Sequence, residues 1–150
     1  MTTLRELVLK IHEDLNDNLN TYIGSTQAVD EDWFEPLSFV PYAPDWETEE
    51  DWFKMGIYLS SPDGAVYTSN SKASNITVAL DCLLDNVREH SALPQLYLSA
   101  VVDYLRKKNY GDSSNVSFAQ IVRTDLDAPA NAFSVAINVT VYSNDMDLDF

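Results

Sequence analysis

The chain has 150 residues, of which 45% are hydrophobic, so it is long enough for one domain with a real core and too apolar for a disordered protein. Nine Lys and Arg residues stand against 24 Asp and Glu residues, which gives a formal net charge of -15 at pH 7. That charge disfavours sequence-specific nucleic-acid binding and binding to anionic membranes, because both depend on basic side chains. No apolar run approaches the roughly 18 residues that a membrane span needs, and we expect an intracellularly assembled protein.

The first segment has apolar residues at steps of three and four, which predicts an amphipathic helix over residues 3–22. Its apolar stripe consists of Leu4, Leu7, Val8, Ile11, Leu15, Leu19 and Tyr22. Thr2 or Thr3 is placed to cap this helix, and Gly24 is expected to end it. Charged residues interrupt the apolar ones, so the segment is interpreted as a helix and not as a signal peptide.

Residues 25–53 form a long segment that prolines punctuate, in which "LSFVPY" predicts a short strand. Loops of this length are often functional or disordered, and the many aromatic residues argue against disorder. The tripeptide Asp-Trp-Phe occurs twice, at 32–34 and 51–53. The residues around the two copies share nothing further, so we interpret the repetition as coincidence.

The end of this loop, "PDWETEEDWFK", combines five acids with two tryptophans. Trp is a common hot-spot residue of interfaces, and flanking carboxylates complement a basic partner. We therefore hypothesise a partner-binding surface made of Asp45, Trp46, Glu47, Glu49, Glu50, Asp51, Trp52 and Phe53. The alternative is that the tryptophans fold back onto the core of the domain while the acids face water, and the sequence leaves both open.

A second helix is predicted over "LPQLYLSAVVDYLRKKN", where apolar residues recur at helical spacing and Pro94 suits the first turn. Before it, "KMGIYLS" and "AVYTSN" flank Ser61-Pro62-Asp63-Gly64 and predict a hairpin. The next stretch, "SNITVALDCLL", predicts a strand with one buried face. That face consists of Ile76, Val78, Leu80, Cys82 and Leu84.

Two alternating strands close the chain and predict an antiparallel hairpin across the link 127–131. The first sets Val116, Phe118, Gln120 and Val122 against Ser117, Ala119, Ile121 and Arg123. The second places Phe133, Val135, Ile137, Val139 and Val141 on one face. The acidic tail, at about 144–150, is expected to fray.

The order of these elements predicts a single α+β domain over residues 1–150, a two-layer sandwich whose mainly antiparallel sheet is packed by two helices. Catalytic chemistry has few candidates in it. His12, His90 and Cys82 stand alone, and no phosphate loop, zinc cluster or nucleophile elbow is present. We therefore expect no enzyme and no cofactor.

Besides a protein-binding surface, the acids could form a calcium site or imitate DNA. A calcium site is disfavoured because "DWETEEDW" and "SNDMDLD" lack the glycine that folds a loop around the ion, so no metal is expected. A DNA mimic is disfavoured because the acids cluster locally and do not cover the whole surface. A solvated charge run that aids solubility is the plain alternative to the calcium site.

The ordered layout resembles the tail terminator, or tail completion, proteins of long-tailed bacteriophages. The segments that carry the resemblance are "LRELVLKIHEDLNDNL", the loop into a hairpin, "ITVALDCLL", "LPQLYLSAVVDYLRKKN" and the paired strands of "IVRTDLDAPANAFSVAINVTVYS". The resemblance implies a non-enzymatic structural protein of a phage or prophage, a hexameric ring that caps the tail tube or joins it to the head. Its partners would be further copies of itself, tail tube and connector proteins, and its location the virion, or the host cytoplasm during assembly.

The main alternative is a monomeric acidic inhibitor of the immunity type, which binds a basic protein partner. Local acidic charge and exposed aromatic residues suit this class equally well. Size distinguishes the two, because a ring of about six subunits favours the phage protein.

Overall fold

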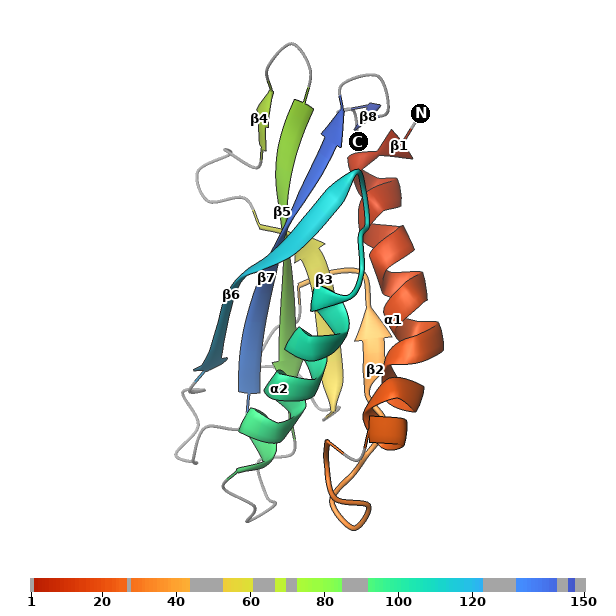
Figure 1. The fold of residues 1–150 in the computed structure, drawn as a ribbon, viewed down its shortest axis with the longest axis vertical. Coiled ribbons are helices and arrows are strands. Elements are labelled where there is room, and N and C mark those ends of the chain that lie inside the picture. The colour runs from red at the N-terminus through yellow and green to blue at the C-terminus, as the bar shows by residue number, and fades with distance from the viewer. Residues whose placement is uncertain are drawn as a thin grey trace.

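A six-stranded sheet and two helices form two layers, with the hydrophobic core between them (Figure 1). The computed structural model describes residues 2–26, 28–43, 53–60, 67–69, 73–84, 92–122, 132–142 and 146–147. The strand order is β2-β3-β5-β7-β6, and β4 also pairs with β5. All these pairs are antiparallel except β2 with β3. The predicted α+β sandwich is confirmed.

The first helix, α1 (Leu4–Thr26), is confirmed but runs past Gly24, which we expected to end it. The last turn is held by side chains that return to the helix backbone. Ser25 Oγ donates to the carbonyl of Tyr22, and Thr26 Oγ1 donates to the carbonyls of Tyr22 and Ile23. Ile23 is fully buried, so tertiary packing also favours this turn over an earlier helix end.

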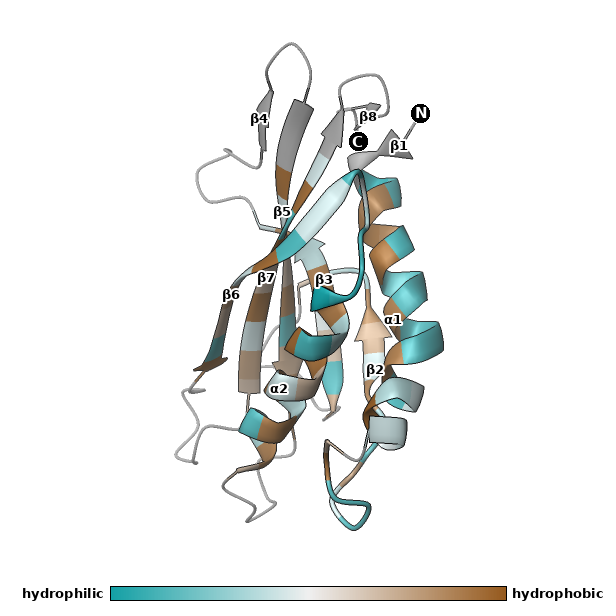
Figure 2. Cartoon of the chain, viewed as in Figure 1, coloured by the Kyte–Doolittle hydropathy of each residue, from teal (hydrophilic) through white to brown (hydrophobic). Residues whose placement is uncertain are grey.

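The second helix, α2 (Leu93–Arg106), confirms the predicted periodicity and has Pro94 in its first turn. A proline suits that position because its missing N–H has no partner there in any helix. The buried residues of α2 are Leu93, Pro94, Tyr97, Ala100, Val101, Tyr104 and Leu105. All of them except Pro94 belong to the same core cluster as the apolar side of α1, and Figure 2 shows brown residues alternating with teal ones along both helices.

The predicted hairpin between residues 54–60 and 65–70 is wrong. Strands β3 (Lys54–Leu59) and β4 (Tyr67–Ser69) both pair antiparallel with β5 (Ala73–Leu83), on consecutive parts of it. They therefore run parallel to each other and cannot form a hairpin. The buried face predicted for β5 is confirmed, since Ile76, Val78, Leu80, Cys82 and Leu84 are at most 1% exposed.

The closing hairpin is confirmed, with β6 (Ser113–Val122) antiparallel to β7 (Ala132–Tyr142). The two faces predicted for β6 are wrong, because a bulge between Val116 and Phe118 shifts the alternation by one residue. As a result, Val116 and Ile121 pack against the core. Phe118, expected on the same face as Val116, is instead 50% exposed. The link 127–131 and Arg123 lie outside the described residues.

Short strands complete the structure. β2 (Ser38–Val40) confirms the strand expected within the loop 25–53 and pairs in parallel with β3. β1 (Thr2–Thr3) pairs in parallel with β8 (Met146–Asp147), so two residues of the tail that we expected to fray lie in a strand beside the N-terminus (Figure 1).

Candidate functional site

Of the partner-binding surface predicted around "PDWETEEDWFK", the structure describes Phe53 alone. The other predicted residues lie outside the described part of the chain: Asp45, Trp46, Glu47, Glu49, Glu50, Asp51 and Trp52. Phe53 is 7% exposed and belongs to the hydrophobic core, so its assignment to a partner-binding surface is wrong. Its backbone has a φ of 58°, a conformation that residues other than glycine rarely adopt. Burial of the ring offsets the cost of that conformation, and the Phe53 carbonyl accepts a hydrogen bond from the N–H of Ser38 at 2.8 Å.

Tyr97 of α2 is the buried residue that holds the long loop against the core. Its hydroxyl accepts from the N–H of Glu35 and donates to the carbonyl of Glu35, each at 2.8 Å. Its ring lies 6.3 Å from the ring of Phe34 and 5.9 Å from that of Phe53. The two Asp-Trp-Phe tripeptides, which we interpreted as a coincidence, therefore place their phenylalanines on the same tyrosine.

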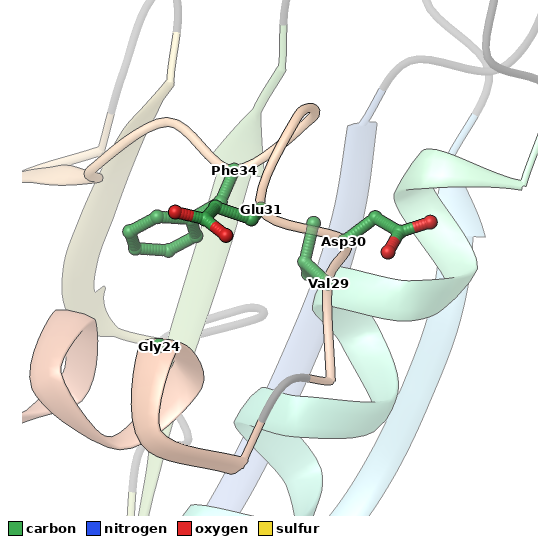
Figure 3. A pocket seen from close by; sticks show the side chains of 5 residues that line it. All are labelled: Gly24, Val29, Asp30, Glu31 and Phe34. Atoms are coloured by element: carbon green, nitrogen blue, oxygen red, sulfur yellow. The ribbon is translucent and has the colours of Figure 1, made fainter.

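A shallow pocket of about 330 Å³ opens where α1 ends and the loop begins, lined by Gly24, Val29, Asp30, Glu31 and Phe34 (Figure 3). In this view the carboxylates of Glu31 and Asp30 point in different directions. Both acids are exposed. An apolar wall with acids at its rim is suited to a basic side chain, whose methylene stem is apolar and whose end is charged.

A polar cluster joins α1 to the end of α2. The Asp14 carboxylate accepts hydrogen bonds from the hydroxyls of Tyr104 and Tyr110, at 3.0 and 2.7 Å, and lies 3.8 Å from Lys108 Nζ. Burial raises the pKa of both tyrosines, and the hydrogen bonds to Asp14 raise it further. Since both hydroxyls stay protonated, they act as donors: Tyr104 links α2 to α1, and Tyr110 links the segment after α2 to α1.

A second, more exposed cluster lies beside it. The Tyr22 hydroxyl donates to Asp103 Oδ2, and Lys107 Nζ lies 3.0 Å from the same hydroxyl and 3.4 Å from the carboxylate. The hydrogen bond from Tyr22 lowers the pKa of Asp103, and Lys107 adds to the effect. Exposed ion pairs contribute little to stability, so this cluster mainly orients the end of α2.

The edge of the sheet at β2 is covered by α1. The Asn20 amide donates to the carbonyl of Leu37 at 2.9 Å and accepts from its N–H at 2.8 Å. His12 Nε2 lies 3.0 Å from the carbonyl of Phe39. The backbone N–H of Ser38 donates to the carbonyl of Phe53, on the side of β3. Backbone groups alternate in direction along a strand, so the N–H and carbonyl groups of Leu37 and Phe39 point the opposite way, toward the outer edge of the sheet. Two side chains of α1 thus take the place of a further strand.

The opposite edge, at β6, is different. Near its start the N–H of Ser114 is 3.3 Å from the side-chain oxygen of Asn109, and Ser114 Oγ donates to the carbonyl of Lys108. Beyond that point, from Val116 to Val122, no described element covers the outer edge, and Figure 1 shows β6 at the margin of the sheet. Sequence reasoning missed this edge, although its signal was present, since "SSNVSFAQIV" contains no charged residue and no proline.

The face of the sheet opposite the helices carries hydrogen-bonded polar residues. Tyr58 and Ser134 both donate to the carboxylate of Asp81, each at 2.5 Å. Thr77 donates to Asn138 at 2.9 Å, and Phe118 lies directly across from Ala136. Burial, followed by the hydrogen bond to Asp81, raises the pKa of Tyr58. The part of this face around Asp81 and Thr77 is therefore polar and hydrogen-bonded, whereas Leu83 and Ala132 on the same face are buried. The exposed ring of Phe118 lies beside the β6 edge.

The candidate catalytic residues are placed as follows. His12 holds the β2 edge through the carbonyl of Phe39. Cys82 is fully buried, and burial raises the pKa of its thiol well above the usual range. His90 lies outside the described residues. Among the residues that the structure does describe, no three His, Cys, Asp or Glu side chains are grouped so as to hold a metal ion. No described helix is long and apolar enough to cross a membrane.

Comparison with known proteins does not assign this chain to a protein family. No protein-family model matches the chain, and no curated protein matches it. The features available for a functional interpretation are therefore the open β6 edge, the polar face of the sheet and the acidic pocket.

Proposed function

We propose that this chain is a non-enzymatic structural protein of a long-tailed phage or prophage, which forms a homo-oligomeric ring of about six copies that caps the tail tube or joins it to the head. The observation that carries the proposal is the two-layer arrangement, in which both described helices pack on the same face of the sheet. Among the described residues, no helix or strand lies beyond the β6 edge, and Phe118 beside that edge is 50% exposed, so this part of the surface is available to a neighbouring subunit. Its location would be the virion, or the host cytoplasm during assembly.

The charge of the chain is consistent with this proposal. Each copy carries a formal charge of -15, so a ring would surround its lumen with a strongly negative field. Such a lumen would not retain DNA that passes through it. The same field makes copies repel one another, so the contacts between subunits would have to be uncharged and well packed.

The test is to purify the chain, measure its mass by light scattering and image it by negative-stain electron microscopy, alone and with purified tail tubes. The proposal predicts rings of about six 16.9 kDa subunits, either free or at the ends of tubes. A monomer that stays a monomer when tubes are added, and that leaves the tube ends bare, would contradict it.

The second candidate is a monomeric acidic inhibitor of a basic protein, and the pocket at Asp30, Glu31 and Phe34 is the observation that favours it. Aromatic and acidic groups at one exposed site suit an Arg- or Lys-bearing partner. The genes beside this one distinguish the candidates directly. Head and tail genes would support the ring protein, and a gene for a basic toxin would support the inhibitor.

A further inference from the structure

We propose that a second copy of this chain docks on the free edge of β6, so that the two β6 strands pair antiparallel about a two-fold axis and join two sheets into one. The inference rests on the self-association in the proposed function and is independent of the phage setting. It assigns one subunit contact to a named strand. A ring that used this contact would be built from dimers joined through a second surface.

The first support is the contrast between the edges of the sheet. Exposed strand edges offer unpaired backbone groups to other chains, and proteins usually block them with covering elements, charged residues, proline or very short strands. Here Asn20 and His12 cover β2, and β4 is 3 residues long. β6 is 10 residues long and has none of these protections over its second half. It is the described edge with enough length for stable pairing.

The second support is charge. Two copies with a formal charge of -15 repel each other, so contact is least unfavourable where no charged side chain is present. The 10 residues of β6 include none. A basic partner would instead be attracted to acidic surfaces such as that of Asp30 and Glu31, where its charge is complemented. The uncharged edge therefore suits another acidic chain, and a second copy supplies a strand of the same length.

The third support is Phe118. The bulge after Val116 turns this ring out of the core and onto the face of the sheet opposite the helices, where it is 50% exposed beside the β6 edge. Pairing centred near Phe118 places the two rings of a symmetric dimer as cross-strand neighbours, and such aromatic pairs stabilise strand pairing. Two-fold contacts require the same patch on both copies, which this arrangement provides.

The test is sedimentation velocity over a range of concentrations with wild type, Phe118→Lys and Leu9→Lys. Both substitutions replace an exposed apolar side chain with a cation, since Leu9 of α1 is 40% exposed. We expect Phe118→Lys to weaken self-association at least about tenfold, because two like charges would face each other across the strands. Leu9→Lys should associate as the wild type does. Equal association of all three proteins would overturn the inference.

A disulfide trap gives a second readout that does not depend on weakening the contact. The native cysteine, Cys82, is buried and cannot form a disulfide with another chain. Any covalent dimer therefore forms through the cysteine that is introduced. Under mild oxidation Phe118→Cys should form a covalent dimer, and Leu9→Cys should remain monomeric. Absence of the dimer from Phe118→Cys while the wild type still associates would also overturn the inference. The two proposals fail separately: rings that survive Phe118→Lys refute the β6 contact alone, and β6 dimers that never form rings refute the ring alone.

Discussion

The side chain of Asn20 pairs with the backbone of Leu37 through two hydrogen bonds, as a neighbouring strand would. This pairing lies across 17 residues of sequence and joins the C-terminal half of α1 to the residue just before β2. One side chain thereby satisfies both backbone groups of an edge residue, and it covers the edge that would otherwise resemble β6.

Replacing Asn20 with Ala leaves the Leu37 N–H and carbonyl without that partner. We expect a loss of about 1–3 kcal/mol in the free energy of unfolding, measured by urea titration, because both groups are partly buried. Asn16→Ala is the matched control, since Asn16 is exposed on the same helix. It should change stability by less than about 0.5 kcal/mol. Equal effects of the two substitutions would show that the edge pairing contributes nothing.

Tyr97→Phe keeps the ring between Phe34 and Phe53 and removes only the hydroxyl. The backbone of Glu35 then loses both of its bonds to Tyr97, and we expect a cost of about 1–3 kcal/mol together with faster hydrogen exchange in residues 28–37. Tyr42→Phe serves as the control, because Tyr42 is 56% exposed. Unchanged exchange in the loop would mean that the aromatic contacts alone hold it in place.

The tyrosines around Asp14 predict a loss of stability at alkaline pH. Burial raises the folded-state pKa of Tyr104 and Tyr110 above the unfolded value of about 10. Above that pH the unfolded chain has released protons that the folded chain still holds, so the free energy of unfolding falls as pH rises. Below it the contribution is fully present.

Tyr110→Phe should make that alkaline decline shallower, as measured by denaturant unfolding between about pH 8 and pH 11. The exposed Tyr42→Phe should leave the slope unchanged. A slope that is the same in wild type and Tyr110→Phe would exclude Tyr110 as its source.

Cys82 offers a direct check of the core. Its thiol is buried and its pKa is raised, first by burial and then by the nearby charge of Asp81, so the reactive thiolate is suppressed in the folded protein. We expect a disulfide reagent at pH 8 to leave the native protein unlabelled and to label one thiol per chain in denaturant. Rapid labelling of the native protein would contradict the position of Cys82 on the inner face of β5.

Periodicity was sufficient for the elements that bury one continuous face. The stripe of α1 and the alternation of β5 and β7 were predicted because apolar spacing depends only on local geometry. The partners of β3 and β4 were not, since a turn signal such as Pro62-Asp63-Gly64 is local and strand pairing is not. Likewise, nothing in "VSFAQIV" marks the bulge that exposes Phe118.

The candidate site was harder to predict for the same reason. Acids and tryptophans drew attention to residues 45–53, where Phe53 proved to be part of the core. The β6 edge depends on what covers each strand, and the cover of β2 comes from His12 and Asn20, far away in sequence. The lack of charge in β6 was visible beforehand, but its meaning requires the strand order.

Hydrogen exchange at β6 tests the central claim most directly, because it reports the backbone groups that a second copy would pair. Exchange is followed by mass spectrometry in a peptide covering 113–122, at two protein concentrations on either side of the association midpoint. A peptide covering β2 provides the internal reference, since α1 already covers that edge. We expect protection of 113–122 to rise with concentration while the β2 peptide stays constant. Protection that does not change in 113–122 while the protein associates would contradict the claim.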